Sequence, residues 1–340
     1  MDRGSIDESS PSLWRYAAAL PQELAQHRVS FDEGCTPLLQ VPALGDGIHL
    51  KLDYLFPSSS FKDRGTTVLI SELLRLGRGR LMEDSSGNAG ASLATYAARA
   101  GLDCEVFVPE STSAGKLVQI RLAGATLRRI PGSREDTADA ALVAADDPAQ
   151  PFYASHNWHP FFIEGVKTVG FEIWEQLGFQ VPDVIVAPAG NGSMILGLHR
   201  AFLELQRGGA IKTLPKIVAV QAAACAPLAA AFTDGRSDIS AFDKQPTLAE
   251  GIASSRPIRA RQILEALRHT DGTALAVPES ALIPAVHHLA GHGFFVEPTS
   301  AVVTAALPDL RKRGILAAGA TIVLILSGSG LKATERLQNV

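Results

Sequence analysis

The chain has 340 residues, 46% of them hydrophobic and 19% charged, a globular composition with enough apolar material for one large or two medium domains. A formal net charge of −4 gives no reason to expect nucleic acid or an anionic membrane as a partner. The three cysteines form no Cys-x-x-Cys pair, so neither a disulfide framework nor a zinc site is predicted.

The N-terminal segment is polar, and its first dozen residues are predicted to be mobile. It contains neither the apolar core of a signal peptide nor a membrane-spanning stretch, so we expect a cytoplasmic protein. Leu13–Leu20 is predicted to be a short helix that Pro21 ends.

From residue 37 onward, short apolar strands alternate with helical segments. This alternation predicts an α/β fold in which parallel-rich, doubly wound sheets carry helices on both faces. The predicted strands are His49–Tyr54, Arg80–Glu83, Cys104–Val108, Thr126–Ile130, Val184–Ala187, Ile217–Gln221 and Thr321–Leu326.

The segment from residue 80 to residue 130 forms a β-α-β-α-β unit, and an alanine-rich helix over 134–147 follows it. We therefore expect a small domain over residues 53–155, inserted into a larger discontinuous domain of residues 1–52 plus 156–340. Ligands of such sheets bind at the carboxyl ends of the strands.

Lys62 lies just ahead of the helical pattern of Thr66–Leu76, between small and aromatic residues. A lysine in this setting can be partly desolvated, which lowers its pKa and frees the amine to attack a carbonyl. A surface lysine paired with Asp63 at a helix start would have the same local sequence, so both interpretations stay open at this point.

Two loops of small polar residues, Asp84–Gly90 and Ala189–Ser193, each connect a predicted strand to a predicted helix. Such a loop directs free backbone N–H groups at one point, and the helix dipole adds partial positive charge, which suits a small anionic cofactor. Ordinary turns and caps use the same residue types, so each loop by itself is weak support.

A dinucleotide-binding enzyme is disfavoured. Its fingerprint is Gly-x-Gly-x-x-Gly at a strand–helix turn, with an acidic residue ending the next strand. Here the glycine that follows Gly190-Asn191-Gly192 is Gly197, which is too far along, and the next strand ends at Gln221.

The histidines do not predict a metal site. His288 and His292 have helical spacing, but Gly291 and Gly293 interrupt the helix and no Glu-x-x-His context is present. The segment of His156 and His159 is expected to follow a strand, and both a place at the ligand-binding edge and a purely local turn fit that position.

Lys62 and the two loops together resemble the pyridoxal-phosphate enzymes of the tryptophan-synthase-β superfamily (fold type II), most closely the threonine synthases. The matching segments cover the chain from about residue 30 to the C-terminus. They are Glu33–Leu38, Ser60–Gly65, Ser86–Asn88, Glu164–Thr168, Gly190–Gly192, Glu297–Ala301 and Leu326–Lys332.

The resemblance implies pyridoxal 5′-phosphate in the cleft between the two domains, with Lys62 forming the Schiff base and then serving as base and acid. It places Asn88 at the 3′-oxygen and Ser327 beside the pyridine nitrogen, where a hydroxyl favours elimination over transamination. The cofactor-binding residues that it implies are Lys62, Phe61, Asn88, Gly190, Asn191, Gly192, Ser193 and Ser327. The substrate-binding residues that it implies are Ser85, Ser86, Ala89 and Asn157.

The substrate end of the pattern departs from the threonine synthases. Phe162 stands where they typically have an arginine, and Ser327 and Ser329 stand where they usually have Thr and His. The run Glu250–Ala253 looks more like the serine and threonine dehydratases. The basic residues that could hold a substrate phosphate instead are Lys116, Lys167, Arg256 and Arg259.

More than one activity therefore stays open. The first is a threonine synthase-like reaction, in which O-phosphohomoserine and water give threonine and phosphate. The second is a serine or threonine dehydratase (ammonia-lyase), or another β-replacement enzyme. A catalytically silent binding protein of the same fold is a third, which the intact lysine and both anion-binding loops disfavour. A small-molecule amino-acid substrate and a homodimer are implied by the resemblance alone.

Overall fold

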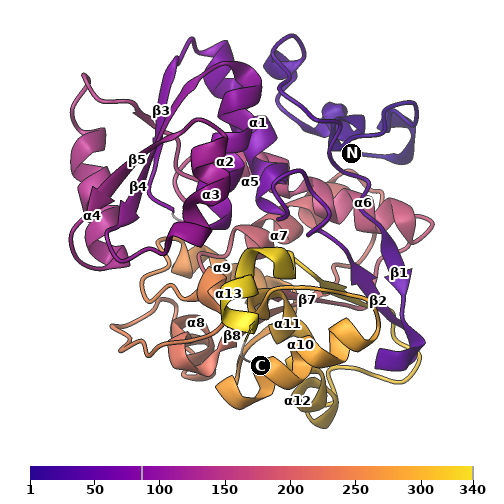
Figure 1. Ribbon diagram of the computed structural model, residues 1–340. Coiled ribbons are helices and arrows are strands. Elements are labelled where there is room, and N and C mark those ends of the chain that lie inside the picture. Colours follow the sequence, from indigo (N-terminus) through magenta and orange to yellow (C-terminus); the bar gives the residue numbers. More distant parts are fainter. Residues whose placement is uncertain (86, 339–340) are drawn as a thin grey trace.

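The computed structural model describes residues 1–85 and 87–338, with the backbone but not the side chain of Lys116 (Figure 1). Its strands form a six-stranded sheet in the order β1-β2-β10-β7-β8-β9 and a four-stranded sheet in the order β5-β4-β3-β6. All neighbouring strands pair in parallel except β1 and β2, which are antiparallel. The predicted α/β class is confirmed.

The strands are β1 (Leu38–Gln40), β2 (Ile48–Lys51), β3 (Arg80–Glu83), β4 (Asp103–Pro109), β5 (Thr126–Ile130), β6 (Phe152–Tyr153), β7 (Val184–Pro188), β8 (Lys216–Ala222), β9 (Thr273–Val277) and β10 (Ile322–Ile325). The α-helices are α1 (Lys62–Arg75), α2 (Asn88–Ala100), α3 (Ala114–Leu122), α4 (Arg134–Ala145), α5 (Pro160–Val166), α6 (Thr168–Gln176), α7 (Ser193–Arg207), α8 (Pro227–Thr233), α9 (Ala260–His269), α10 (Leu282–Gly291), α11 (Pro298–Ala305), α12 (Leu307–Lys312) and α13 (Thr334–Leu337). The 3₁₀ helices are η1 (Arg3–Ser5), η2 (Leu13–Ala19), η3 (Gln22–Leu24), η4 (Pro42–Leu44), η5 (Ala223–Cys225), η6 (Glu250–Ile252), η7 (Glu279–Ala281) and η8 (Gly330–Ala333).

The larger sheet is covered on both faces, and strand β7 shows how. All of its residues are buried, and successive side chains of a strand point to opposite faces. Ile185 and Ala187 join the core that includes Leu198 of α7, whereas Val184 and Val186 join the core that includes Val302 of α11. A continuous apolar run is typical of such a doubly covered parallel strand.

Each predicted strand forms, with shifted ends in most cases. Strands β1, β6 and β9 were not predicted. Strands β1 and β6 have three and two residues and are too short to carry a periodic signal. The helix predicted over Thr66–Leu76 begins four residues earlier, at Lys62. The predicted helix at Leu13–Leu20 is a 3₁₀ helix over Leu13–Ala19.

The C-terminal segment, yellow in Figure 1, lies against elements of the smaller sheet's half of the molecule. Lys332 donates to the Ser58 carbonyl at 2.8 Å and to Gln119 Oε1 at 2.8 Å. Glu335 accepts a hydrogen bond from the Ser113 hydroxyl at 2.9 Å. This segment therefore ties the six-stranded sheet, which it follows in the chain, to helix α3.

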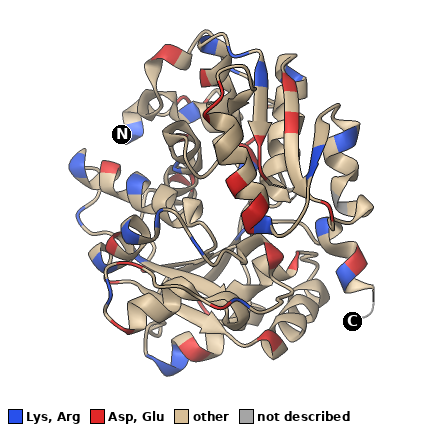
Figure 2. Ribbon diagram, turned by 90° about the vertical axis from the view of Figure 1, so that its left-hand side faces the viewer, with Lys and Arg blue, Asp and Glu red and all other residues tan. Residues whose placement is uncertain are grey.

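Charged residues of both signs are spread around the periphery in the view of Figure 2. Of the helices that the structure describes, none combines the length and the apolar character needed to cross a membrane.

Candidate active site

A cavity of about 1610 Å³ lies between the two sheets' halves of the molecule. Ser86, one of the predicted substrate-binding residues, lies outside the described residues. All the other predicted site residues line this cavity: Phe61, Lys62, Ser85, Asn88, Ala89, Asn157, Gly190, Asn191, Gly192, Ser193 and Ser327.

Lys62 is the first residue of α1, and its side chain projects between two aromatic rings. Its Nζ lies 4.7 Å from the ring centre of Phe61 and 5.6 Å from that of Phe162. No hydrogen bond or ion pair holds this amine among the described residues. Burial lowers the pKa of Lys62 to about 8, although Glu83 and Glu297 oppose the shift. The amine is therefore prepared to act as a nucleophile near neutral pH.

The first turn of α1 is fixed by a buried ionic cluster of Lys51, Asp53, Arg64 and Glu172. Arg64 donates to Asp53 through Nε and Nη2, both at 2.8 Å, and to Glu172 at 2.9 Å. Lys51 Nζ lies 2.5 Å from Glu172 Oε1. Burial alone would raise the pKa of Glu172, but Arg64 and Lys51 lower it below its ordinary value. The cluster thereby holds the backbone two residues from Lys62.

Two glycines let α1 and α5 cross closely beneath Lys62. A Cβ atom added to Gly65 would lie 2.6 Å from the Phe162 ring, and one added to Gly165 would lie 2.0 Å from the Arg64 carbonyl oxygen. Side chains cannot fit at either position without moving the helices apart. This packing explains why both glycines occur in the chain and why Phe162 lies beside the amine.

The loop between β7 and α7 is shaped to bind an anion. Gly192 has a φ of 76°, a left-handed conformation that glycine adopts without steric cost. The N–H groups of Gly190, Asn191 and Gly192 have no hydrogen-bond partner within the described part of the chain. They lie at the N-terminus of the 15-residue helix α7, where the dipole also favours a negative ligand.

Asn88 opens helix α2 and donates through Nδ2 to Glu297 Oε1 at 3.0 Å. Glu297 also lines the cavity, and burial raises its pKa to about 7 despite the nearby Lys332 and Asn88. In the sequence, Glu297 stood out only as part of a motif and without a role of its own. Because 209 residues separate the two partners, only the fold reveals that they meet.

Ser327 follows β10 and is held in place by Ser300. Its N–H donates to the Ser300 hydroxyl at 3.0 Å, and the two hydroxyl oxygens are 3.2 Å apart. Ser327 is only 2% exposed, and its carbonyl accepts a hydrogen bond from the Phe61 N–H at 2.9 Å. The hydroxyl is thus a fixed, neutral hydrogen-bonding group on the wall of the cavity.

The two histidines of the segment after β6 have different roles. His159 accepts a hydrogen bond at Nδ1 from the Phe161 N–H at 3.3 Å and so caps α5, which is the local turn that the sequence allowed. His156 lines the cavity, with its Nδ1 2.9 Å from Glu83 Oε1. Both placements that the sequence left open are therefore found, one for each histidine.

The basic residues suggested for a substrate phosphate are differently placed. Arg259 donates to the carbonyls of Asn157 and Trp158, at 2.8 and 2.9 Å, and supports the segment after β6. Arg256 lines the cavity but is exposed, 3.7 Å from Asp139. The side chain of Lys116 is outside the described part of the structure.

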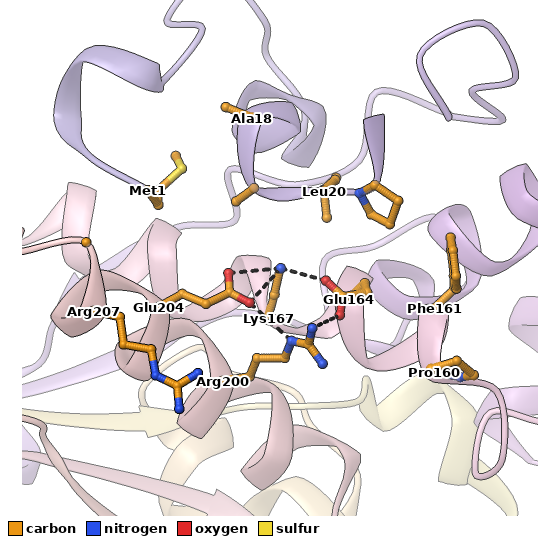
Figure 3. A pocket seen from close by; sticks show the side chains of 13 residues that line it. Met1, Ala18, Leu20, Pro160, Phe161, Glu164, Lys167, Arg200, Glu204 and Arg207 are labelled. Atoms are coloured by element: carbon orange, nitrogen blue, oxygen red, sulfur yellow. Dashed lines mark hydrogen bonds and ion pairs between the residues drawn. The ribbon is translucent and has the colours of Figure 1, made fainter. Parts of the chain in front are cut away.

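Lys167 faces a different hollow, with a volume of about 720 Å³, beneath the N-terminal segment (Figure 3). It pairs there with Glu164 at 2.6 Å and Glu204 at 2.9 Å, while Arg200 pairs with Glu164 at 2.5 Å. These ions compensate one another, so Lys167 is unavailable to a ligand of the larger cavity. Among the described residues, no group of three or more His, Cys, Asp and Glu is placed to hold a metal ion.

The chain matches the family model described as pyridoxal-phosphate dependent enzyme over residues 29–328. It is 35% identical to a threonine synthase from Methanosarcina acetivorans, with 100% of this chain and 85% of that protein aligned. It is 37% identical to a threonine synthase from Mycobacterium tuberculosis, with 89% of this chain and 83% of that protein aligned.

Solved structures give the same fold. A threonine deaminase from T.th. superposes with a TM-score of 0.75 at 26% identity, covering 91% of this chain and 98% of that one. A fungal L-serine ammonia-lyase from Rhizomucor miehei superposes with a TM-score of 0.76 at 21% identity, covering 90% of this chain and 97% of that one.

Proposed function

Because the chain belongs to the family of pyridoxal-phosphate dependent enzymes, we propose that it is a threonine synthase-like lyase that removes a leaving group from the side chain of an amino acid. In a threonine synthase reaction, O-phosphohomoserine and water give threonine and phosphate. The observation that carries the proposal is that the amine of Lys62, unpaired among the described residues, shares one cavity with the two loops that precede α2 and α7.

The residues of the cavity fit pyridoxal 5′-phosphate, which needs a lysine amine, a phosphate cradle and a partner for its ring nitrogen. Lys62 would hold its aldehyde carbon, the loop of Gly190–Ser193 would hold its phosphate, and Ser327 would meet its ring nitrogen. When bound, the cofactor supplies the electron withdrawal that makes the Cα proton of an amino acid acidic.

The remaining work falls to the protein's own groups. The amine of Lys62 would take the proton from the substrate Cα, for which its lowered pKa suits it. The loop of Ser85 and the first turn of α2, with Asn88 and Ala89, would bind the substrate carboxylate at a helix N-terminus. The hydroxyl of Ser327, being neutral, would leave the ring nitrogen unprotonated, and this supports elimination.

Borohydride reduction tests the assignment of Lys62. The cofactor-loaded protein should yield a reduced, fluorescent adduct that peptide mapping locates on the peptide of Lys62. Lys62→Ala serves as the control and should give no such peptide. An adduct on any other lysine in the wild-type protein would contradict the proposal.

A second candidate, an ammonia-lyase acting on a hydroxy amino acid, is supported by Phe162. Its buried ring cannot donate a hydrogen bond to a phosphate, unlike the arginine of typical threonine synthases. Product analysis separates the two activities: O-phosphohomoserine should give phosphate and threonine, whereas serine or threonine should give ammonia and a 2-oxo acid. Binding without turnover across both panels would favour a silent binding protein.

We further propose that the protein acts as a homodimer, as the family resemblance suggests, and in the cytoplasm, as its polar N-terminal segment suggests. Light scattering coupled to size-exclusion chromatography measures the oligomeric state, and a fluorescent fusion shows the cellular location. A monomer that retains full activity would contradict the proposed dimer.

A further inference from the structure

We propose that Lys167 is a positioning residue, which sets the separation between the amine of Lys62 and the loop of Gly190–Ser193 by fixing helix α5 on helix α7. The proposal rests on the proposed function and concerns the cofactor end of the same site. Lys167 belongs to the segment Glu164–Thr168, which matched the family in the sequence and to which the proposed function gives no role.

Four charged side chains form a closed ionic ring between the end of α5 and the middle of α7 (Figure 3). Lys167 Nζ lies 2.6 Å from Glu164 Oε2 and 2.9 Å from Glu204 Oε2. Arg200 closes the ring, with Nη2 2.5 Å from Glu164 Oε1 and Nε 3.1 Å from Glu204 Oε1. Each charge of the ionic ring therefore has two partners of opposite sign.

Lys167 is the buried cation of the ionic ring and lies at a joint of the chain. It ends α5, and α6 begins at the next residue. Its side chain is 2% exposed, whereas that of Arg200 is 49% exposed. Attraction between charges strengthens as water is excluded, so the ion pairs of Lys167 are the stronger part of the ring. A shift of α5 along α7 would pull Lys167 away from Glu204 and break them.

Helix α5 is in close contact with both α1 and α7. A Cβ atom added to Gly165 of α5 would lie 2.0 Å from the Arg64 carbonyl oxygen of α1. A Cβ atom added to Gly197 of α7 would lie 3.1 Å from the backbone nitrogen of Lys167. In an interior packed this closely, a displacement of one helix is passed to its neighbours. The position of α5 on α7 therefore also fixes the position of α1.

The two helices that α5 contacts carry the two ends of the proposed cofactor site. Helix α1 begins with Lys62, in the turn that also contains Arg64. Helix α7 begins at Ser193, the last residue of the loop, and Arg200 and Glu204 follow about two and about three turns later. The ionic ring thus joins the helix of the amine to the helix of the loop, and a shift of α5 would change the distance between amine and loop.

A ligand held at two points depends on the separation of those points. Pyridoxal 5′-phosphate would be held by Lys62 at its aldehyde carbon and by the loop at its phosphate, and the two attachments assist each other only at the correct spacing. Pyridoxal has the aldehyde but no phosphate, so it would be held by the amine without the loop. A change at Lys167 should therefore weaken the binding of pyridoxal 5′-phosphate far more than that of pyridoxal.

Titration of the full, cofactor-free chain with the two ligands tests the proposal. Absorbance gives the dissociation constants of pyridoxal 5′-phosphate and of pyridoxal for the wild type, Lys167→Met and Lys167→Arg. In Lys167→Met the constant for pyridoxal 5′-phosphate should rise at least about tenfold, and that for pyridoxal by less than about twofold. Lys167→Arg keeps a cation between the two carboxylates and should restore part of the difference.

Leu310→Ala is the control for a general loss of stability. Leu310 is fully buried in the core on the other face of the larger sheet from α7, away from the ionic ring, so its truncation destabilises the protein without changing the position of α5. Urea unfolding measures the loss of stability in both variants. The ratio of the two dissociation constants should stay at the wild-type value in Leu310→Ala and change in Lys167→Met.

The outcomes separate the role of Lys167 from the proposed function. A wild-type ratio in Lys167→Met, with both ligands weakened equally or not at all, would overturn the role of Lys167 alone. Failure of the wild-type protein to bind either ligand would overturn the proposed function itself. Glu204→Gln, which removes one charge of the ionic ring but keeps a hydrogen-bond acceptor, decides the question if Lys167→Met does not fold, and it should change the ratio in the same direction by a smaller factor.

Discussion

Two lysines that the fold takes largely out of water differ in the partners of their amines. Lys51 donates to the Thr36 carbonyl at 2.6 Å, to Glu172 at 2.5 Å and to Gln176 at 2.8 Å. Lys62 is the first residue of a helix and faces two aromatic rings instead. Burial lowers the pKa of both amines. What distinguishes them is whether hydrogen-bond acceptors surround the amine. An ammonium group with all its hydrogen bonds made is a structural group, whereas an amine without acceptors is a reactive one.

The same contrast separates two carboxylates nearby, those of Glu172 and Glu297. Glu172 is held ionised by Arg64 and Lys51, so its pKa falls despite burial. Burial prevails at Glu297 and raises its pKa to about 7, and among the described residues the amide of Asn88 is its one hydrogen-bond donor. The carboxylate that is paired with cations therefore supports α1, and the carboxylate that has few partners lines the cavity.

The largest expected effect is on turnover. Lys62→Ala should lower kcat by at least about 10³-fold, because it removes both the covalent attachment point and the proton-transferring amine. Steady-state product formation measures the loss, and far-UV circular dichroism checks the fold. Lys51→Met is the matched control, and its folded fraction should retain most of the activity. Equal loss of kcat in the two folded variants would mean that the amine of Lys62, which lacks hydrogen-bond acceptors, has no special role.

The free energy of unfolding should depend strongly on the buried ion pairs and little on Lys62, which is the opposite of the order expected for turnover. Arg64→Met leaves Asp53 and Glu172 buried without their main partner, and such losses cost about 3–5 kcal/mol. Urea unfolding of the cofactor-free protein measures the change. Lys62→Met removes an amine that burial already disfavours and should leave the free energy of unfolding unchanged or higher. A large loss of stability in Lys62→Met, with little in Arg64→Met, would reverse the comparison.

The pH dependence of cofactor attachment sharpens the comparison further. Only the unprotonated amine attacks an aldehyde, so the attachment rate should rise with a midpoint near pH 8, where the pKa of Lys62 lies. Stopped-flow absorbance after mixing with pyridoxal phosphate measures it. Since Glu83 and Glu297 raise the pKa of Lys62, Glu297→Gln should move the midpoint to lower pH. A midpoint that moves upward in this variant would exclude the expected coupling.

The same lowered pKa has a consequence for stability. The unfolded chain binds the Lys62 proton more tightly than the folded chain, so Lys62 makes the cofactor-free protein more stable as the pH rises from about 8 to about 10.5. Comparing the wild type with Lys62→Met over this range isolates that contribution from those of other groups. Parallel pH profiles of the two proteins would show that the pKa is not depressed.

The smallest effect is expected at an exposed ion pair. Asp309 of α12 and Arg313, which follows the helix, are 2.8 Å apart and roughly half exposed, and pairs of this kind contribute about 0.3–0.5 kcal/mol. Arg313→Ala should therefore change the free energy of unfolding by less than about 1 kcal/mol, and high salt should reduce the difference. A loss comparable to that of Arg64→Met would show that burial is not what makes the cluster around Arg64 strong.

The parts of the site that the sequence predicted are those in which a single strand, loop and helix follow one another. Lys62 at a helix start, the loop before α2 and the loop before α7 all belong to this kind, and the cavity brings them together. The backbone of each loop is shaped by its own glycines and by the adjoining helix, as Gly192 with its left-handed φ illustrates. Local sequence is enough to specify such a unit.

The pairings that tune the site were not predictable in this way. Glu83 and His156 are 73 residues apart, and Asn88 and Glu297 are 209 apart. Arg64 meets Glu172 across 108 residues. No periodicity or spacing in the chain connects such partners, since they meet only where two sheets and their helices pack. Phe162 was recognised as a departure, but its contact with Lys62 required the crossing of α1 and α5.

The sequence by itself determined the alternation of strands and helices, the place of Lys62 at the start of a helix and the glycine-containing turns ahead of α2 and α7. Each depends on side-chain and backbone preferences within a short stretch of chain. Tertiary structure alone decided which of the charged groups neutralise one another and which are left facing the cavity. Electrostatic energies depend on distance and on exclusion of water, and both are set by packing between segments that lie far apart along the chain.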